Sequence, residues 1–217
     1  MRSAADWSSP SRASLACGDV NPRVVAALFV LALCALGAIL LAAGGAREDP
    51  GDPQRFEGAT RPPGQLAPDF ELTDQDGDRI AMRSLRGRPV IVTFLYTTCE
   101  DTCPTQAQVV RSALGELGED VPALAIAVDP PRDTPARARA FLSEQRMTGR
   151  MTFALGSRRQ LEPVWKGFAV EPQRDDLEHT AVLLLVDPRG RQRVSYPVGE
   201  ATPERLAHDV RLLAAGR

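Results

Sequence analysis

The chain has 217 residues, of which 43% are hydrophobic and 25% are charged, and its formal net charge is −2. This composition is typical of one globular domain with additional segments. Nucleic-acid binding requires a dense basic stretch, which the sequence lacks, so no nucleic-acid partner is expected.

The N-terminal third of the chain changes composition twice. Residues 1–23 are rich in Ser and Ala and are expected to be a disordered tail, whereas residues 24–43 carry no charge. Twenty such residues are long enough to cross a hydrocarbon core of about 30 Å. A cleaved signal peptide is the alternative, but its apolar core is typically only ~7–15 residues long. We therefore predict one transmembrane anchor at 24–43, followed by a Pro- and Gly-rich linker at 44–66.

The arginines do not decide the orientation of this anchor, because three precede it and three follow it before residue 62. With the N-terminus inside, Cys17 would be cytoplasmic and Cys34 would lie in lipid. Cys99 and Cys103 would then be the only thiols of the exported domain. An oxidising compartment would permit a disulfide between them.

Residues 67–217 are sufficient for a single hydrophobic core and are predicted to form one domain. Residues 70–72 and 79–81 flank the turn Asp74–Gly77, which indicates an N-terminal β-hairpin. Longer apolar runs predict buried strands, and apolar residues at helical spacing predict helices between them. The predicted strands are 90–95, 123–128, 153–155, 181–186 and 192–196, and the predicted helices are 104–117, 135–147, 161–168 and a last one opened by Thr202 and Pro203.

This order of elements predicts the fold class. Strand, helix, strand and helix are followed by a hairpin and a helix, which is the thioredoxin-like layout. The domain is therefore expected to be an α/β fold with a central mixed sheet flanked by helices.

Two cysteines follow the apolar run 90–95 at the point where the chain enters a helix. Cys99 and Cys103 thus lie at the C-terminal end of a strand, where α/β proteins build their sites. The positive end of the helix dipole favours thiolate over thiol. Such a pair is either a redox couple or two soft metal ligands.

His179 is the third candidate. The strand 181–186 is expected to run antiparallel to 90–95, which brings the residues before Ala181 to the cysteine turn. Two thiolates and one imidazole suit copper, although zinc accepts the same set with a water. The plainer alternatives are a histidine bonded only to backbone and a disulfide that merely staples the turn.

Several motifs surround these residues: APDFELTD at 67–74, CEDTCPT at 99–105, AVDPPRDTP at 127–135 and HTA at 179–181. With these motifs the chain resembles the Sco (SenC-type) family of copper chaperones for cytochrome c oxidase. The resemblance implies that Cys99, Cys103 and His179 bind copper as Cu(I) or Cu(II).

The resemblance also implies a location and a partner. Family members are membrane-anchored, so a single-pass protein of the cell membrane is expected, with its domain facing the periplasm or cell exterior. The implied partner is the copper-containing subunit of a terminal oxidase, to which the domain would deliver copper or whose copper site it would reduce. Enzymatic turnover is not required.

Acidic residues near the site match the family in some positions and depart from it in another. Asp101, Asp129 and Asp133 match acidic positions of the family motifs. Glu100 stands where the family usually has Pro, and its carboxylate is expected to raise the pKa of the thiols.

The alternative function is thiol–disulfide exchange, in which Cys99 and Cys103 form a redox-active disulfide. Against it, the spacing is CxxxC rather than CxxC, and no Trp precedes the first cysteine. A thiol peroxidase would need Thr in place of Tyr96.

Overall fold

The computed structural model describes residues 21–43, 55–118, 121–172, 181–197 and 199–216, without the side chains of 37–43. The chain forms two compact units, Met1–Pro50 and Gly51–Arg217. In the first unit, helix α1 spans Pro22–Ala43, where the anchor is predicted. Within the described ranges, no helix meets the length and apolarity needed to cross a bilayer.

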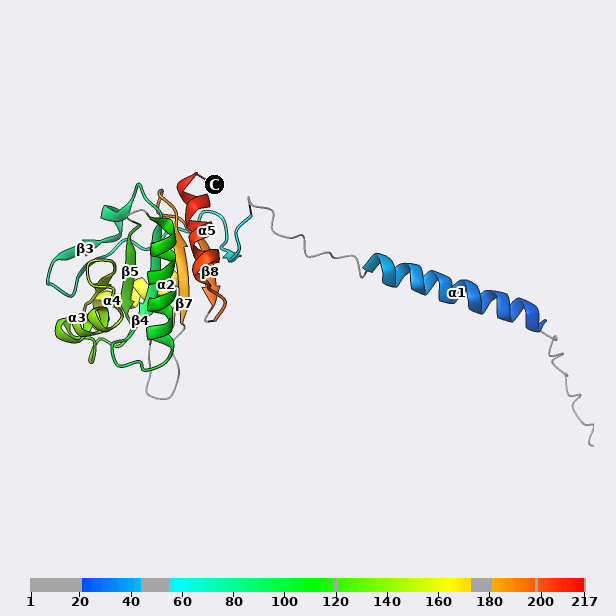
Figure 1. Ribbon diagram of the computed structural model, residues 1–217, viewed down its shortest axis with the longest axis horizontal. Helices are drawn as coiled ribbons and strands as arrows, with labels where there is room; N and C mark the ends of the chain where they lie inside the picture. Colours follow the sequence, from blue (N-terminus) through cyan, green and yellow to red (C-terminus); the bar gives the residue numbers. More distant parts are fainter. Residues whose placement is uncertain (1–20, 44–54, 119–120, 173–180, 198, 217) are drawn as a thin grey trace, which may run out of the picture. The chain divides into compact units, whose positions relative to one another are not determined.

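The second unit is built on a six-stranded mixed sheet with the order β1-β8-β7-β4-β5-β6 (Figure 1). Its centre is β4 (Val90–Leu95), which runs parallel to β5 (Ala123–Ala127) and antiparallel to β7 (Val182–Val186). The predicted mixed sheet flanked by helices is thereby confirmed. The other elements are β1 (Ala59–Thr60), β2 (Glu71–Thr73), β3 (Arg79–Ala81), the 3-10 helix η1 (Met82–Leu85), α2 (Thr102–Leu117), α3 (Pro135–Glu144), β6 (Thr152–Ala154), α4 (Arg158–Phe168), β8 (Gln192–Pro197) and α5 (Pro203–Ala214). Strands β2 and β3 form the predicted hairpin as a separate two-stranded sheet.

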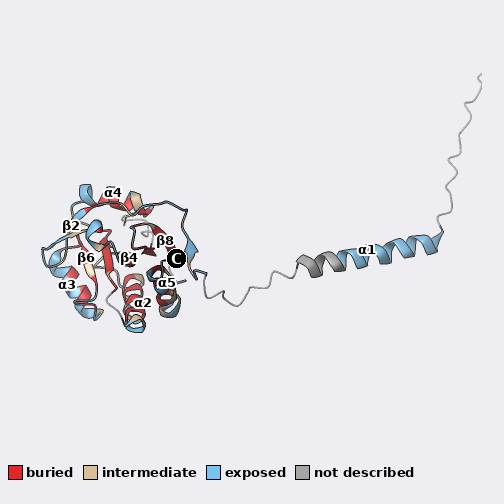
Figure 2. Ribbon diagram, turned by 90° about the horizontal axis from the view of Figure 1, so that it is seen from above, coloured by how far each residue is buried: buried red, intermediate tan, exposed pale blue. Residues whose placement is uncertain are grey.

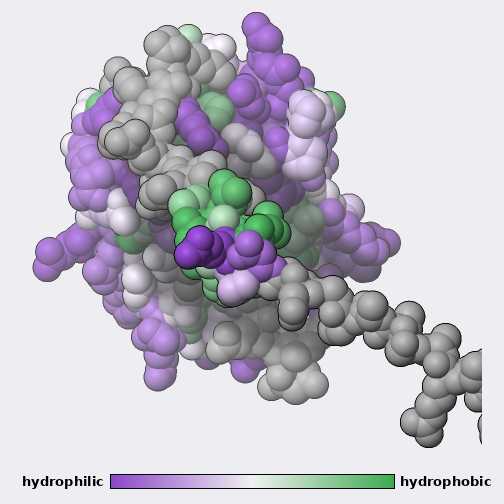
Figure 3. Space-filling view, turned by 90° about the vertical axis from the view of Figure 1, so that its right-hand side faces the viewer, coloured by the Kyte–Doolittle hydropathy of each residue, from purple (hydrophilic) through white to green (hydrophobic). Residues whose placement is uncertain are grey.

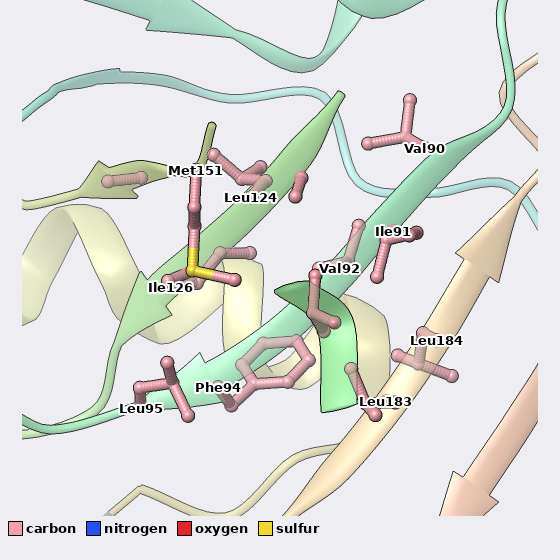
Figure 4. Packing of buried hydrophobic residues seen from close by; sticks show 14 of the residues in the cluster. Val90, Ile91, Val92, Phe94, Leu95, Leu124, Ile126, Met151, Leu183 and Leu184 are labelled. Atoms are coloured by element: carbon pink, nitrogen blue, oxygen red, sulfur yellow. The ribbon is translucent and has the colours of Figure 1, made fainter. Parts of the chain in front are cut away.

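Helices cover both faces of the six-stranded sheet. Helices α2 and α5 lie together on one face, and α4 covers the opposite face (Figure 2). All six residues of β4 are buried, as a strand covered on both faces requires. The side chains of β4 lie between those of β5 and β7 (Figure 4). On the α4 side, Phe94 meets Phe168 edge to face, with ring centroids 5.4 Å apart.

The surface has the opposite character. The face shown in Figure 3 is mostly hydrophilic, as expected when the apolar side chains of a domain are in its core.

Helix boundaries differ from the sequence predictions for local reasons. Helix α2 begins two residues before Pro104. Proline has no backbone N–H, and it is tolerated here because the N–H groups of a first helical turn have no intrahelical partner. Helix α3 ends at Glu144, short of the predicted residue 147, since Arg146 adopts a left-handed φ of 56°. Helix α4 begins before Pro163, at a capping box formed by Ser157 and Gln160.

The predicted linker at 44–66 is too long, because its second half belongs to the folded unit. Strand β1 pairs with β8, and the backbone N–H groups of Glu57 and Gly58 donate to the carboxylate of Asp209 at 2.8 and 3.0 Å. Asp209 is completely buried and also accepts from the Tyr196 hydroxyl. This buried carboxylate satisfies backbone donors that come from a distant part of the chain, a contact that composition does not reveal. Residues 44–54 of the linker lie outside the described residues.

This packing predicts opposite effects for two glycine substitutions. In Gly58→Ala the new Cβ would overlap the Val194 side chain and lie 2.7 Å from Tyr196 Cζ, so the free energy of unfolding should fall by about 1–3 kcal/mol. In the matched control Gly115→Ala nothing lies within 4 Å of the new Cβ. Because Gly115 is inside α2, this change should stabilise the fold by roughly 0.5–1 kcal/mol. Urea unfolding measures both; equal effects would contradict the assignment of residue 58 to the domain.

Candidate metal centre

The two cysteines lie at the junction between β4 and α2. Cys99 is half-buried in the turn after β4, and Cys103 is fully buried in the first turn of α2. Both are free thiols. The backbone N–H of Cys103 donates to the Cys99 sulfur at 3.3 Å, so the sulfur of Cys99 lies against the N-terminus of the helix. The predicted placement of the thiol pair is confirmed.

The surroundings of Cys99 favour its thiolate form. Burial on its own raises the pKa of this thiol, but hydrogen bonds from the Cys103 side chain, from the backbone of Cys103 and Asp101 and from the Tyr96 side chain lower it. The net result is a pKa below that of an ordinary cysteine. The expectation that Glu100 leaves this thiol with a raised pKa is not met at Cys99, because the net shift is downward. Cys99 is therefore the better nucleophile of the two and the one that more readily becomes a metal-binding thiolate.

Cys103 has the opposite character. Burial strongly raises the pKa of its thiol, and the neighbouring Cys99 and the carboxylate of Asp133 raise it further. A cation placed between the two sulfurs would offset this cost, because positive charge stabilises both thiolates. The donor set is thus suited to a soft metal ion such as copper.

Asp133 connects the cysteine turn to the loop after β5. Its buried carboxylate accepts hydrogen bonds from the N–H of Thr97 at 2.7 Å, from the Thr97 hydroxyl at 2.9 Å and from the N–H of Asp129 at 3.0 Å. Thr97 precedes Cys99 by two residues, so Asp133 fixes the start of the turn. Burial raises the pKa of Asp133 to about 6, although these hydrogen bonds lower it.

The other acidic candidates have different environments. The Asp129 carboxylate is buried and forms an ion pair with Arg132. Asp101 is exposed at the N-cap of α2, where its side chain makes no capping hydrogen bond. Neither side chain touches the sulfurs in the described contacts. Tyr96 and Thr97 are the functional neighbours that sequence reasoning missed; their position directly after a buried strand was the available signal.

The third predicted ligand, His179, lies in the segment 173–180, outside the described residues. Among the residues that are described, no group of three or more His, Cys, Asp or Glu side chains is arranged to hold a metal. The described register does confirm the topology on which the prediction depends, because β7 runs antiparallel to β4 with Leu183 opposite Thr93. The chain therefore enters β7 at the end of the sheet from which the cysteine turn departs. A cavity of about 530 Å³ lies at the starts of β5 and β6, at the end of the sheet opposite to the cysteine turn. Neither cysteine lines it.

Comparison with known proteins identifies the family. A family model described as SCO1/SenC matches residues 58–215. The chain belongs to the SCO1/SenC family. The match begins at Gly58, the residue at which the contacts with Asp209 show the domain already packed.

Relatives of this SCO1/SenC chain include one protein that is named for copper. A protein of Stutzerimonas stutzeri that is named as copper-binding is 32% identical over 142 residues, which cover 58% of this chain and 66% of that protein. The chain spans about half to two thirds of the length of the first curated relatives that it matches.

Solved structures of the family support the fold. The copper-bound structure of ScoI from Bradyrhizobium japonicum is 32% identical, has a TM-score of 0.56, and is matched over 67% of this chain and 98% of that one. The copper-bound ScoI of Arabidopsis thaliana is 23% identical with a TM-score of 0.61, over 69% of this chain and 99% of that one. At 23% identity the latter supports the fold alone.

The thiol environments predict unequal alkylation. In the reduced chain at pH 7.5, iodoacetamide should modify Cys99 at least about tenfold faster than Cys103, because Cys99 has the lower pKa and is accessible. Mass spectrometry of peptides measures each rate separately. In Cys99→Ser, the alkylation of Cys103 should remain slow. Equal alkylation rates of Cys99 and Cys103 in the wild type would contradict this description of the turn.

Asp133 predicts a pH dependence of stability. Its pKa is higher in the folded than in the unfolded chain, so the folded state binds more protons between about pH 4 and pH 6. This carboxyl therefore stabilises the fold below its unfolded pKa, and that contribution is lost as the pH rises through about 6. Relative to Asp133→Asn, which does not titrate, the wild type should lose up to about 3 kcal/mol of unfolding free energy between pH 4 and 7. Urea unfolding at each pH measures the unfolding free energy of both proteins. If the two free energies changed in parallel with pH, the raised pKa of Asp133 would be refuted.

Proposed function

We propose that this chain is a copper metallochaperone that binds one copper ion through Cys99, Cys103 and His179. It would deliver this ion to the copper-containing subunit of a respiratory oxidase, or reduce the copper site of that subunit. The observation that carries the proposal is the pair of free thiols at the N-terminus of α2, one of which has a lowered pKa.

Chain geometry supports His179 as the third ligand. His179 precedes Val182, the first residue of β7, by three residues, so its Cα lies within about 11 Å of the Cα of Val182. The register places Leu183 opposite Thr93, two residues before the end of β4. This short tether to the start of β7 supports His179 as the third ligand, because the cysteine turn leaves the same end of the sheet.

Copper is favoured over zinc by two lines of support. Two thiolates and an imidazole form a soft donor set that suits copper in either oxidation state. The ScoI structure from B. japonicum, at 32% identity, contains copper, and the S. stutzeri relative is named as copper-binding.

Thiol–disulfide exchange is the second candidate function, and the asymmetry of the two thiols favours it. A Cys99 thiolate would attack a partner disulfide, and the sulfur released from the partner would take up a proton. Cys103, losing its proton, would then displace the partner as a second thiol and leave a Cys99–Cys103 disulfide. Both roles use the same pair and are not exclusive.

The proposal includes membrane attachment through residues 24–43. It is supported by the large apolar side chains of α1 between Val24 and Leu36, which are 49–69% exposed. Exposed apolar surface of this extent indicates an interaction with another apolar phase. The domain would face the periplasm or the cell exterior.

Histidine substitutions test the ligand set. The chain has two histidines, and in His179→Ala the copper affinity should fall at least about 100-fold, because one of three ligands is lost. The matched control is His208→Ala, since His208 lies on α5 and its Nδ1 contacts Asp209 at 3.0 Å. A copper titration of the reduced chain, followed by the thiolate-to-copper absorption band, measures both. Equal copper affinity of His179→Ala and the wild type would refute the proposal that His179 is the third copper ligand.

A further inference from the structure

An apolar hollow lies directly beside the cysteine turn. It has a volume of about 230 Å³ and is lined by the start of α2, by β7 and by the segment between β8 and α5. Its apolar lining includes Val109, Leu183 and Ala201, while Asp101 and Thr102, which lie between the two cysteines, form part of its edge. Anything that enters the hollow therefore contacts the residues that separate the two cysteines in the sequence, although neither cysteine lines the hollow itself.

One buried polar side chain lines this hollow without a full set of partners. Gln106 is only 6% exposed, and its carbonyl oxygen accepts a hydrogen bond from the hydroxyl of Thr93 at 2.9 Å. Among the described residues, its amide nitrogen has no hydrogen-bond partner, yet it is not one of the atoms sealed from solvent. If the amide group is turned over, its nitrogen faces the Thr93 hydroxyl instead, and its oxygen becomes the atom without a hydrogen-bond partner. A buried amide with an unused group is costly unless an external group completes it.

The described lining of the hollow carries negative charge from Asp101, although the guanidinium of Arg205 donates to the backbone carbonyl of nearby Glu200 at 2.6 Å. Asp101 lines it, and two exposed carboxylates, Glu100 and Glu200, adjoin lining residues in the sequence. None of the described lining residues is Lys or Arg. An occupant with an apolar group for the apolar lining and a cationic group for the acidic edge would complement the hollow.

The size of the hollow limits what it can hold. Sites for whole small molecules usually measure about 300–1,000 Å³, and this hollow is smaller. It is suited to a single large side chain. Apolar side chains seated in pockets are the groups that anchor protein interfaces.

We propose that this hollow receives one large aliphatic side chain of the protein that exchanges copper with this chain. Gln106 donates to a backbone carbonyl of the inserted segment, and Asp101 with Glu200 pairs with a Lys or Arg beside the aliphatic residue. The inference rests on the proposed function, because it assigns the docking point of the copper-exchange partner.

Three blocked tripeptides test the chemistry of the hollow on the full chain in detergent, reduced and without metal. Acetyl-Lys-Leu-Lys-amide should give saturable amide shifts in the ¹H–¹⁵N NMR spectrum, confined to the first turns of α2 and to residues 199–201. Acetyl-Lys-Ser-Lys-amide and acetyl-Glu-Leu-Glu-amide should bind at least about tenfold more weakly, the first for lack of an apolar side chain and the second through charge repulsion. No saturable binding of the Leu peptide, or equal binding of the acidic one, would overturn the proposal.

Two variants locate the binding. Ala201→Leu fills the hollow and should weaken binding of the Lys-Leu-Lys peptide at least about tenfold, and Gln106→Leu should weaken it about fivefold by removing the donor. The matched control is Ala136→Leu on the exposed side of α3, which should bind as the wild type does. Gln106→Leu and Asp101→Asn keep the test decisive should Ala201→Leu not fold. Unchanged affinity in these variants would refute the site.

A copper titration of the same samples separates this inference from the proposed function. A chain that binds copper but not the peptide would refute the docking site alone. A chain that binds the peptide but not copper would refute the metal role and leave the hollow as an interaction site.

Discussion

The backbone N–H of Cys103 points at the sulfur of Cys99, and the chemistry of the site depends on that contact. It exists because a fully buried strand, β4, ends where α2 begins, so that the turn between them carries one cysteine and the first helical turn carries the other. The unpaired N–H groups of a helix start stabilise negative charge. Cys99 is therefore disposed to become a thiolate, whereas burial raises the pKa of Cys103, which holds its proton more tightly.

The rest of the fold keeps this turn in place. The loop after β5 supplies the carboxylate of Asp133, which holds Thr97 through two hydrogen bonds just before Cys99. On the far face, α4 is attached to the same end of β5, because the indole N–H of Trp165 donates to the carbonyl of Ala127 at 2.9 Å. These buried contacts hold the backbone on both sides of the cysteine turn and so limit its movement.

The surroundings of the turn combine a reactive group with a means of recognition. An apolar hollow with acidic residues near its edge adjoins the first turn of α2, and a buried glutamine lines it with an unused hydrogen-bonding group. Transfer of a metal between proteins requires that the two sites approach within bonding distance. An anchoring contact directly beside the ligands would achieve this without a large interface, which allows the partners to separate after transfer.

The sequence by itself determined the order of the main strands and helices along the chain, the hairpin and the position of both cysteines, because buried strands, helix periodicity and capping residues are local signals. It also identified the SCO1/SenC motifs at residues 99–105 and 127–135. Only the tertiary structure decided that Glu57 and Gly58 belong to the domain, through hydrogen bonds to an aspartate some 150 positions later. It likewise decided the unequal pKa values of the thiols and the role of Asp133, since burial and long-range hydrogen bonds depend on how distant segments pack and leave no periodic trace in the sequence.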